Sequence, residues 1–250
     1  MDRGIWAIWY ELGEDSKSDY LDWFHRVHIP EKLSRPGYLW AAHYELGHGG
    51  ARFRKVMGRL THVREPGLGR GGGYLALFGG LTAHRFLNPS PDQLAERQST
   101  ETRKMIGMRQ EVYSCIFAEE VRINGPEVAK RGPGITPGPI VQMGNFNVAS
   151  HEVEADVGAW YAQYRLPFMA SMPGCIGARK LLATAGWGKH SILYEYVSLE
   201  QREQQFIPHE EEVHDPNSWT GRVIQHLRHA PCSPAVGRRI WPLPPAPRAG

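Results

Sequence analysis

The sequence is poor in cysteine, has no long apolar run and carries no excess of charge of either sign. Its 250 residues include three cysteines, Cys115, Cys175 and Cys232, which are widely spaced and form no Cys-x-x-Cys pair. This odd number and spacing make a disulfide framework and a structural zinc site unexpected. No apolar run reaches the roughly 18 residues that a membrane-spanning helix requires, so no membrane association is expected.

The charges are too evenly balanced for a protein that must neutralise many phosphates. Lys and Arg number 29 against 26 Asp and Glu, a net charge of +3, so nucleic acid is not an expected partner. The first residues, Met1 to Gly4, lack the basic and apolar regions of a signal peptide. We therefore expect a cytoplasmic globular protein with one large domain or two small ones.

An internal repeat organises the chain. Residues 23–37 align without a gap on residues 160–174, an offset of 137. Both copies read Trp-[Phe/Tyr]-x-x-[Val/Tyr]-[His/Arg]-[Ile/Leu]-Pro, and a Pro-Gly pair follows six residues after that proline. A shared Trp and Pro can arise by chance, but the Pro-Gly in register indicates a duplication.

Each copy is flanked by segments of matching type. Apolar, β-branched and aromatic runs predict strands, and Pro or Gly punctuates the turns between them. The strands expected in the first half are 5–11, 38–46, 73–81 and 112–121, with helices from about 16 and over 91–106. Those expected in the second half are 140–148, 175–183, 191–199 and 237–242, with helices before Pro167 and over 216–227. Each half thus has the order βαββαβ, which is a ferredoxin-like unit in an α+β protein.

The predicted domain organisation follows this division. Residues 1–124 form an N-terminal repeat, 125–139 a linker and 140–250 a C-terminal, degenerate repeat with a Pro-rich tail. The first half also carries an insertion at about 47–73, rich in Gly and Arg. We interpret it as a mobile lid or an oligomer arm whose arginines attract an anionic substrate, with a solvated loop as the alternative.

The aromatic helix that carries His-x-Pro, followed by Pro-Gly at the next strand, resembles the EthD-like branch of the dimeric α/β-barrel superfamily. The residues that carry the likeness are Tyr20, Phe24, His28, Pro30, Pro36 and Gly37, and in the second half Val157, Tyr161, Arg165, Pro167, Pro173 and Gly174. The resemblance implies that two ferredoxin-like repeats pack sheet to sheet as a fused dimeric α/β-barrel. Whether such fused pseudo-dimers form a homo-oligomer stays open.

Related proteins include cofactor-free polyketide cyclases, lactone isomerases, small monooxygenases and haem enzymes such as chlorite dismutases. The resemblance implies a small-molecule pocket between the sheet and the helices of a unit. Fold alone does not choose among these chemistries.

His28 is the main catalytic candidate. It lies on the helix stripe expected to face the sheet, just before Pro30, so its imidazole could serve as a general acid or base. The alternative is a buried His that only fills space. Arg165 occupies the equivalent position and could bind a substrate carboxylate or form an inter-helix ion pair. We therefore expect a working pocket in the first half and a degenerate one in the second.

Residues on the first strands could complete such a site. Tyr10, His43 and Tyr44 are candidates to hold a developing oxyanion, although strand alternation sends His43 and Tyr44 to opposite faces. Trp9, Phe24 and Trp40 suggest aromatic walls that bind substrate. For all of these residues, packing in a large aromatic core is the alternative.

Two clusters have the composition of metal sites but not the spacing. They are His25, His28 and Glu31, and His209, Glu212, His214 and Asp215. Adjacent acids and a following proline suit an exposed loop better, so no metal and no cofactor is expected.

The sequence therefore predicts a cofactor-independent enzyme that transfers a proton next to a carbonyl of a small aromatic or polyketide-like substrate. Such an enzyme would be a cyclase, isomerase or lyase. A haem- or oxygen-dependent oxidoreductase and a non-catalytic small-molecule binding module are the alternatives.

Overall fold

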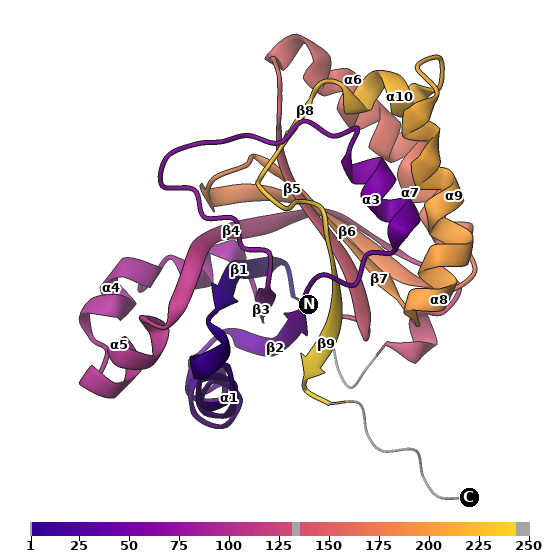
Figure 1. Ribbon diagram of the computed structural model, residues 1–250. Coiled ribbons are helices and arrows are strands. Elements are labelled where there is room, and N and C mark those ends of the chain that lie inside the picture. The colour runs from indigo at the N-terminus through magenta and orange to yellow at the C-terminus, as the bar shows by residue number, and fades with distance from the viewer. Residues whose placement is uncertain (1, 132–135, 244–250) are drawn as a thin grey trace, which may run out of the picture.

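The computed structural model describes residues 2–131 and 136–243 (Figure 1). Residues 132–135 of the predicted linker and 244–250 of the Pro-rich tail lie outside the described residues.

Residues 2–131, the first unit, contain the predicted βαββαβ order with extra short helices. The strands are β1 (Gly4–Leu12), β2 (Tyr38–Glu45), β3 (Tyr74–Gly80) and β4 (Arg109–Asn124). The helices are α1 (Glu14–Trp23), α2 (Ile29–Leu33), α3 (Ala51–Met57), α4 (Pro91–Glu96) and α5 (Thr100–Ile106). The helix expected over 91–106 is interrupted because Ser99 caps a second helix through the backbone N–H of Thr102.

Residues 136–243, the second unit, repeat this order. The strands are β5 (Ile140–Val148), β6 (Cys175–Gly186), β7 (His190–Tyr196), β8 (Leu227–His229) and β9 (Ala235–Trp241). The helices are α6 (Glu154–Trp160), α7 (Leu166–Ser171), α8 (Leu199–Gln201), α9 (Ile207–Glu210) and α10 (Trp219–Ile224). The stretch from α8 to α9 is helical, whereas the sequence pattern predicted a strand up to Leu199 and no helix before 216.

The two sheets close on each other. The strand order is β4-β1-β3-β2 in the first unit and β9-β5-β7-β6 in the second, with every pairing antiparallel. Strand β2 pairs with β9 and β4 pairs with β6, so eight strands form a closed barrel and β8 adds to the edge of β5. In Figure 1 the helices α1, α4 and α5 lie on one side of the barrel and α6, α7, α9 and α10 on the other. The predicted α+β barrel is confirmed.

A π-helical turn interrupts the main helix of each unit at the same place. It spans Phe24–His28 in the first unit and Tyr161–Arg165 in the second, again 137 residues apart. The extra residue in this turn rotates the following helix by about 100°. The helix stripe predicted to face the sheet was Tyr20, Phe24, Val27, His28 and Glu31. It is correct at Tyr20, Phe24 and His28, which are buried, and wrong at Val27, which is 51% exposed, and at Glu31, which is exposed, while Lys32 is buried.

Large aromatic residues fill the barrel interior. Trp9, Trp40 and Tyr44 lie there, in one cluster with leucines from β3, β6 and β7. The phenol of Tyr44 donates a hydrogen bond to the carbonyl of Gly138 at 2.9 Å. Because neighbouring strand residues face opposite sides, Tyr10 and His43 point outward toward the helices instead.

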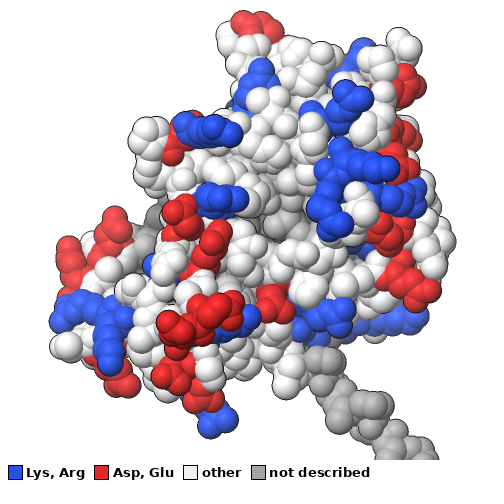
Figure 2. Space-filling view, in the orientation of Figure 1, with Lys and Arg blue, Asp and Glu red and all other residues white. Residues whose placement is uncertain are grey.

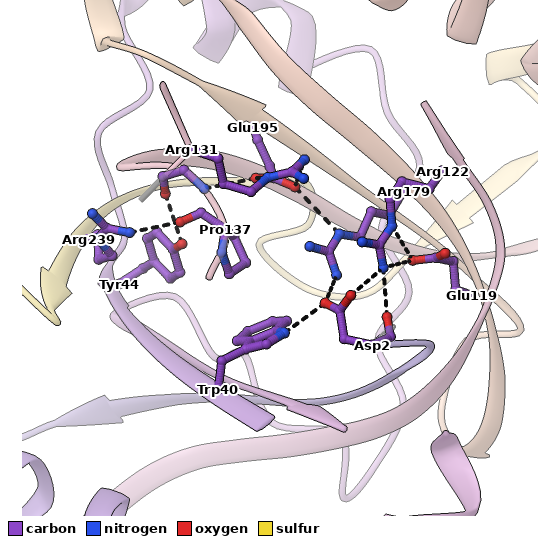
Figure 3. Close-up of polar contacts among 11 residues, drawn as sticks. Asp2, Trp40, Tyr44, Glu119, Arg122, Arg131, Pro137, Arg179, Glu195 and Arg239 are labelled. Carbon is purple, nitrogen blue, oxygen red and sulfur yellow. Dashed lines mark hydrogen bonds and ion pairs between the residues drawn. The ribbon is translucent and has the colours of Figure 1, made fainter. Parts of the chain in front are cut away.

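Buried charges also lie inside the barrel, beside Trp40 (Figure 3). The Asp2 carboxylate accepts hydrogen bonds from Trp40 at 2.7 Å, from Arg122 at 2.8 Å and from Arg179 at 2.7 Å. Glu195 forms an ion pair with Arg131 at 3.1 Å. These contacts join the first residues of the chain to β4, β6 and β7, so they tie the two units together.

Candidate functional site

The space between sheet and helices of the first unit contains a chain of three hydrogen-bonded rings. Tyr10 Oη lies 2.7 Å from His43 Nε2, and His43 Nδ1 lies 2.8 Å from His25 Nε2. A phenol that donates to Nε2 leaves the Nδ1–H of His43 to donate to His25. The half-buried His25 ring stacks on Trp241, so the chain leads from the buried phenol toward the surface.

Burial keeps this chain neutral. It raises the pKa of Tyr10 and lowers that of His43, and it lowers the pKa of His25 to about 4. The two predicted residues Tyr10 and His43 are therefore brought together, through a third residue that the sequence analysis considered only as a metal ligand.

His28 lies apart from these rings. It packs against Trp23 at 4.9 Å and Phe24 at 5.5 Å between ring centroids and is 3% exposed. Burial, followed by the charges of Lys32, Arg109 and Arg35, lowers its pKa to about 2. Its Nδ1 has no hydrogen-bond partner among the described residues. His28 is a neutral imidazole at pH 7 in an aromatic environment.

Side chains fill the rest of this first-unit space. Arg109 donates to Tyr20 Oη at 2.6 Å, and its guanidinium lies over the rings of Tyr10 and Phe24. Phe24 is thus core packing beside His43. Trp9, Trp40 and Tyr44 lie on the other face of the sheet, where they cannot reach His28.

In the second unit, a cavity of about 40 Å³ lies between the sheet and the helices. That is room for about two or three waters. Apolar residues of β5, β7, α6 and α10 form most of its wall, and Val56 and Leu60 of the insertion complete it. Its polar lining residues are Gln142, Tyr161, Arg165, Tyr194, Glu210, Thr220 and His229.

Arg165 is held at this cavity by a carboxylate and two aromatic rings. Its Nη1 donates to Glu210 at 2.8 Å, and its guanidinium lies over Trp160 at 4.6 Å and Phe206 at 5.2 Å. Gln142 donates to the other oxygen of Glu210 at 3.0 Å. Arg165 Nε is buried and has no partner within the described residues, so it can donate to a molecule in the cavity.

His229 lines the same cavity with a free imidazole. Neither ring nitrogen has a hydrogen-bond partner in the described parts of the chain. Burial, together with His62, lowers the pKa of His229 to about 3, so the ring is neutral at pH 7. A neutral imidazole offers one donor and one acceptor.

The insertion covers this cavity, although it belongs to the first unit in sequence. Phe53 and Val56 of α3 are buried, and Phe53 belongs to the hydrophobic core of the second unit. Arg52 donates to both oxygens of Glu211, at 2.8 and 2.5 Å. Figure 2 shows Lys and Arg side chains gathered over α3 beside Asp and Glu side chains. The α3 part of the insertion is therefore packed on the second unit. Residues 64–67 are exposed, and the backbone N–H groups of Arg70 and Gly71 donate to Glu111 of the first unit.

Sequence reasoning missed Gln142, Glu210 and His229. The stretch around His209 was interpreted as an exposed loop, but a second π-helical region of this unit, Arg202–Phe206, precedes Glu210, which is buried.

The other residues of the predicted cluster form separate pairs. His209 forms an ion pair with Glu212 at 3.2 Å, and His214 accepts a hydrogen bond from Arg59. His190 begins β7, and its Nε2 lies at hydrogen-bond distance from Glu154. The pairing of short strand β8 with β5, which places His229, has no local sequence signal.

The described residues hold neither a metal cluster nor a membrane-spanning helix. No group of three or more His, Cys, Asp or Glu side chains there could hold a metal ion. None of the helices in that part of the chain is both long and apolar enough to cross a membrane.

No family model and no curated protein matches this sequence. Solved structures do match. A protein described as a monooxygenase from Fusobacterium nucleatum aligns with a TM-score of 0.52 at 8% identity, over 95% of this chain and 93% of that one. A protein described as a chlorite dismutase aligns with a TM-score of 0.52 at 13% identity, over 96% and 95%. An anthrone oxidase-like protein aligns with a TM-score of 0.52 at 10% identity, over 96% and 91%. With the closed barrel, these likenesses show that the chain has the dimeric α/β-barrel fold.

Haem is a cofactor that this fold family implies. The second-unit cavity measures about 40 Å³. Pockets for drug-sized ligands and cofactors measure roughly 300–1,000 Å³. The unpartnered imidazole of His229 could hold a haem iron, but the cavity is too small for a porphyrin, so the residues present do not fit haem.

Proposed function

We propose that the chain is an enzyme that binds a small oxygenated molecule in the second-unit cavity and transfers a proton next to its carbonyl group. The observation that carries the proposal is the convergence of unsatisfied groups on one cavity: Arg165 Nε and both ring nitrogens of His229. Buried polar groups ordinarily have partners, so a group left free beside a cavity favours a bound ligand.

The chemistry follows from the charges of these groups. Arg165 remains charged and would donate from Nε to the substrate oxygen, where negative charge develops as the proton leaves the adjacent carbon. Glu210, oriented by Arg165 and Gln142, would accept that proton. The neutral His229 would orient the substrate by hydrogen bonds. Return of the proton to another carbon completes an isomerisation.

A glycine in the cavity wall offers a test that leaves the polar groups intact. A Cβ added at Gly144 would lie 3.4 Å from Pro234 Cβ and 3.5 Å from Ile192 Cγ2, which are ordinary contacts. All three residues line the cavity, so Gly144→Ala fills it without a clash. The control is Gly158→Ala, whose added methyl meets nothing within 4 Å.

The measurement uses a panel of the smallest carbonyl compounds, such as acetaldehyde and acetone, because the cavity measures only about 40 Å³. Binding is followed by thermal shift, and proton transfer by NMR detection of deuterium entering the carbon next to the carbonyl. We expect Gly144→Ala to weaken binding at least tenfold and Gly158→Ala to leave it unchanged. Glu210→Gln should bind but lose deuterium exchange, whereas the exposed control Glu200→Gln should retain it. Unchanged binding in Gly144→Ala, or unchanged exchange in Glu210→Gln, contradicts the proposal.

A second candidate places the same reaction in the first unit, and the Tyr10–His43–His25 chain is the observation that favours it. In this version His28 moves the proton, and the ring chain connects the site to the surface. In this version the side chains packed around Phe24 would have to move apart to admit a substrate. Loss of exchange in His28→Ala and His43→Leu, with exchange retained in Glu210→Gln, would favour this site over the second-unit cavity.

A further inference from the structure

A cleft of about 750 Å³ lies on the first unit, away from both sheet–helix spaces. One wall is the corner between α2 and β2, and the other runs from the turn Ala83–Phe86 to α5. Its volume is within the roughly 300–1,000 Å³ of small-molecule sites.

The charge of this cleft is mostly positive. Arg35, Arg85 and Arg97 line it, and Glu31 is the acidic residue in its lining. Glu31 reaches Arg35 Nη2 at 3.4 Å, while Arg35 Nη1 is buried without a partner among the described residues. Arg85 and Arg97 make no side-chain hydrogen bond or ion pair within residues 2–131 and 136–243.

The corner turn brings two of these arginines together. Gly37 adopts φ +88°, and a Cβ there would lie 2.9 Å from Arg85 Cδ. Arg85 therefore packs on the Pro36-Gly37 turn, two residues from Arg35. Both guanidinium groups line the same cleft.

A fourth cation lies behind the cleft wall. Lys32 is 3% exposed, and its Nζ lies 4.8 Å from the centroid of the Trp6 ring. It has no ion-pair or hydrogen-bond partner in the described chain. Burial is the main cause that lowers the pKa of Lys32, to about 7, and Arg35 adds to the effect.

The second unit shows that the fold does not require these charges. At the offset of 137 residues, Met169 occupies the position equivalent to Lys32, and Met172 the position equivalent to Arg35. Both methionines are buried. Gly174 has φ +82°, and the side chain packed on it is Gln201 instead of an arginine. The positive charge is therefore a property of the first unit alone.

We infer that this cleft binds the oxyanion group of a small organic molecule, held by Arg35, Arg85 and Arg97. Guanidinium groups bind phosphate and carboxylate oxygens in the same way, through paired N–H donors. The site is independent of the second-unit cavity and of the reaction proposed there.

Isothermal titration calorimetry at constant ionic strength tests this site. The probes are inorganic phosphate, phenyl phosphate and benzoate, with sodium chloride as the reference. We expect at least one oxyanion to bind, and the ratio of phenyl phosphate to benzoate affinity identifies the preferred anion.

Arg85→Gln and Arg97→Gln, which change exposed side chains, should each weaken binding at least tenfold. Arg26→Gln removes the same charge from the same unit outside the cleft and should leave binding unchanged. Gly144→Ala should also bind normally, which separates this site from the proposed active site. The inference is overturned if no oxyanion binds above the chloride reference, or if Arg85→Gln binds as tightly as Arg26→Gln.

Discussion

Replacing Asp2 with alanine is expected to lower the free energy of unfolding by about 3–5 kcal/mol, because it removes one partner of a buried ion pair. The carboxylate is fully buried and accepts hydrogen bonds from Trp40, Arg122 and Arg179. Without it, the guanidinium groups of β4 and β6 lose a counter-charge inside the barrel. Chemical denaturation at pH 7 measures the difference.

Asp22 provides the matched control. It pairs with Arg26 on the surface, where its side chain is 60% exposed, so Asp22→Ala should change the free energy of unfolding by less than about 1 kcal/mol. A loss below about 1 kcal/mol in Asp2→Ala as well would show that the network does not hold the units together.

The contribution of Asp2 also depends on pH. Burial raises the pKa of Asp2, but the charge of Arg179 and hydrogen bonds from Arg122, Arg179 and Trp40 outweigh burial and hold it below 3.8. A lowered native pKa stabilises the native state above the unfolded pKa, and this stabilisation is lost as the pH falls further. The difference between the native chain and Asp2→Ala should therefore shrink below about pH 4.

Lys32→Met is expected to stabilise the protein by up to about 5 kcal/mol at pH 6, since a shift of about 3.5 pKa units corresponds to about 1.4 kcal/mol per unit. The native pKa of Lys32 is lowered to about 7 from 10.5, chiefly by burial. Met169, which stands at the equivalent position in the second unit, shows that a methionine fits.

The sign of the pH dependence follows from proton linkage. Below pH 7 the native chain carries the buried charge, and its full cost is present. Between pH 7 and 10.5 the unfolded chain binds the proton and the native chain does not, so stability rises with pH. The advantage of Lys32→Met should therefore decline toward pH 10.5, as measured by denaturation at several pH values.

Lys104→Met, at an exposed position on α5, should show neither the stabilisation nor its pH dependence. If Lys32→Met is less stable than the native chain at pH 6, the prediction that the buried Lys32 charge destabilises the protein is wrong.

The order of strands was predictable because its signals are local and occur twice. Runs of β-prone residues and the two Pro-Gly turns marked the same elements in both halves, and Gly37 and Gly174 both adopt the positive φ that such a turn needs. The helix face was predicted correctly at Tyr20, Phe24 and His28, which are buried. From Phe24 on, the π-helical turn shifts the buried face by one residue, so that Val27 and Glu31 are exposed, and a regular 3.6-residue period does not include that shift.

The candidate site was less predictable. Tyr10 and His43 were each candidates to line the site, and the structure joins them by a hydrogen bond. His28, however, packs among aromatic rings away from them, and the cavity lies beside Arg165 in the unit expected to be degenerate. A cavity remains where the side chains of several helices and strands together do not fill the space between them. A single sequence motif does not contain that information.

The amino-acid sequence alone specifies two βαββαβ units and their turns, because strand period, helix period and Pro-Gly chemistry act between residues close in the chain. Only the tertiary structure decides that α3 of the insertion covers the other unit, that Glu210 and His229 line one cavity with Arg165, and that the arginine cleft forms. Those contacts join segments more than 40 residues apart, so they depend on how the closed barrel places its helices.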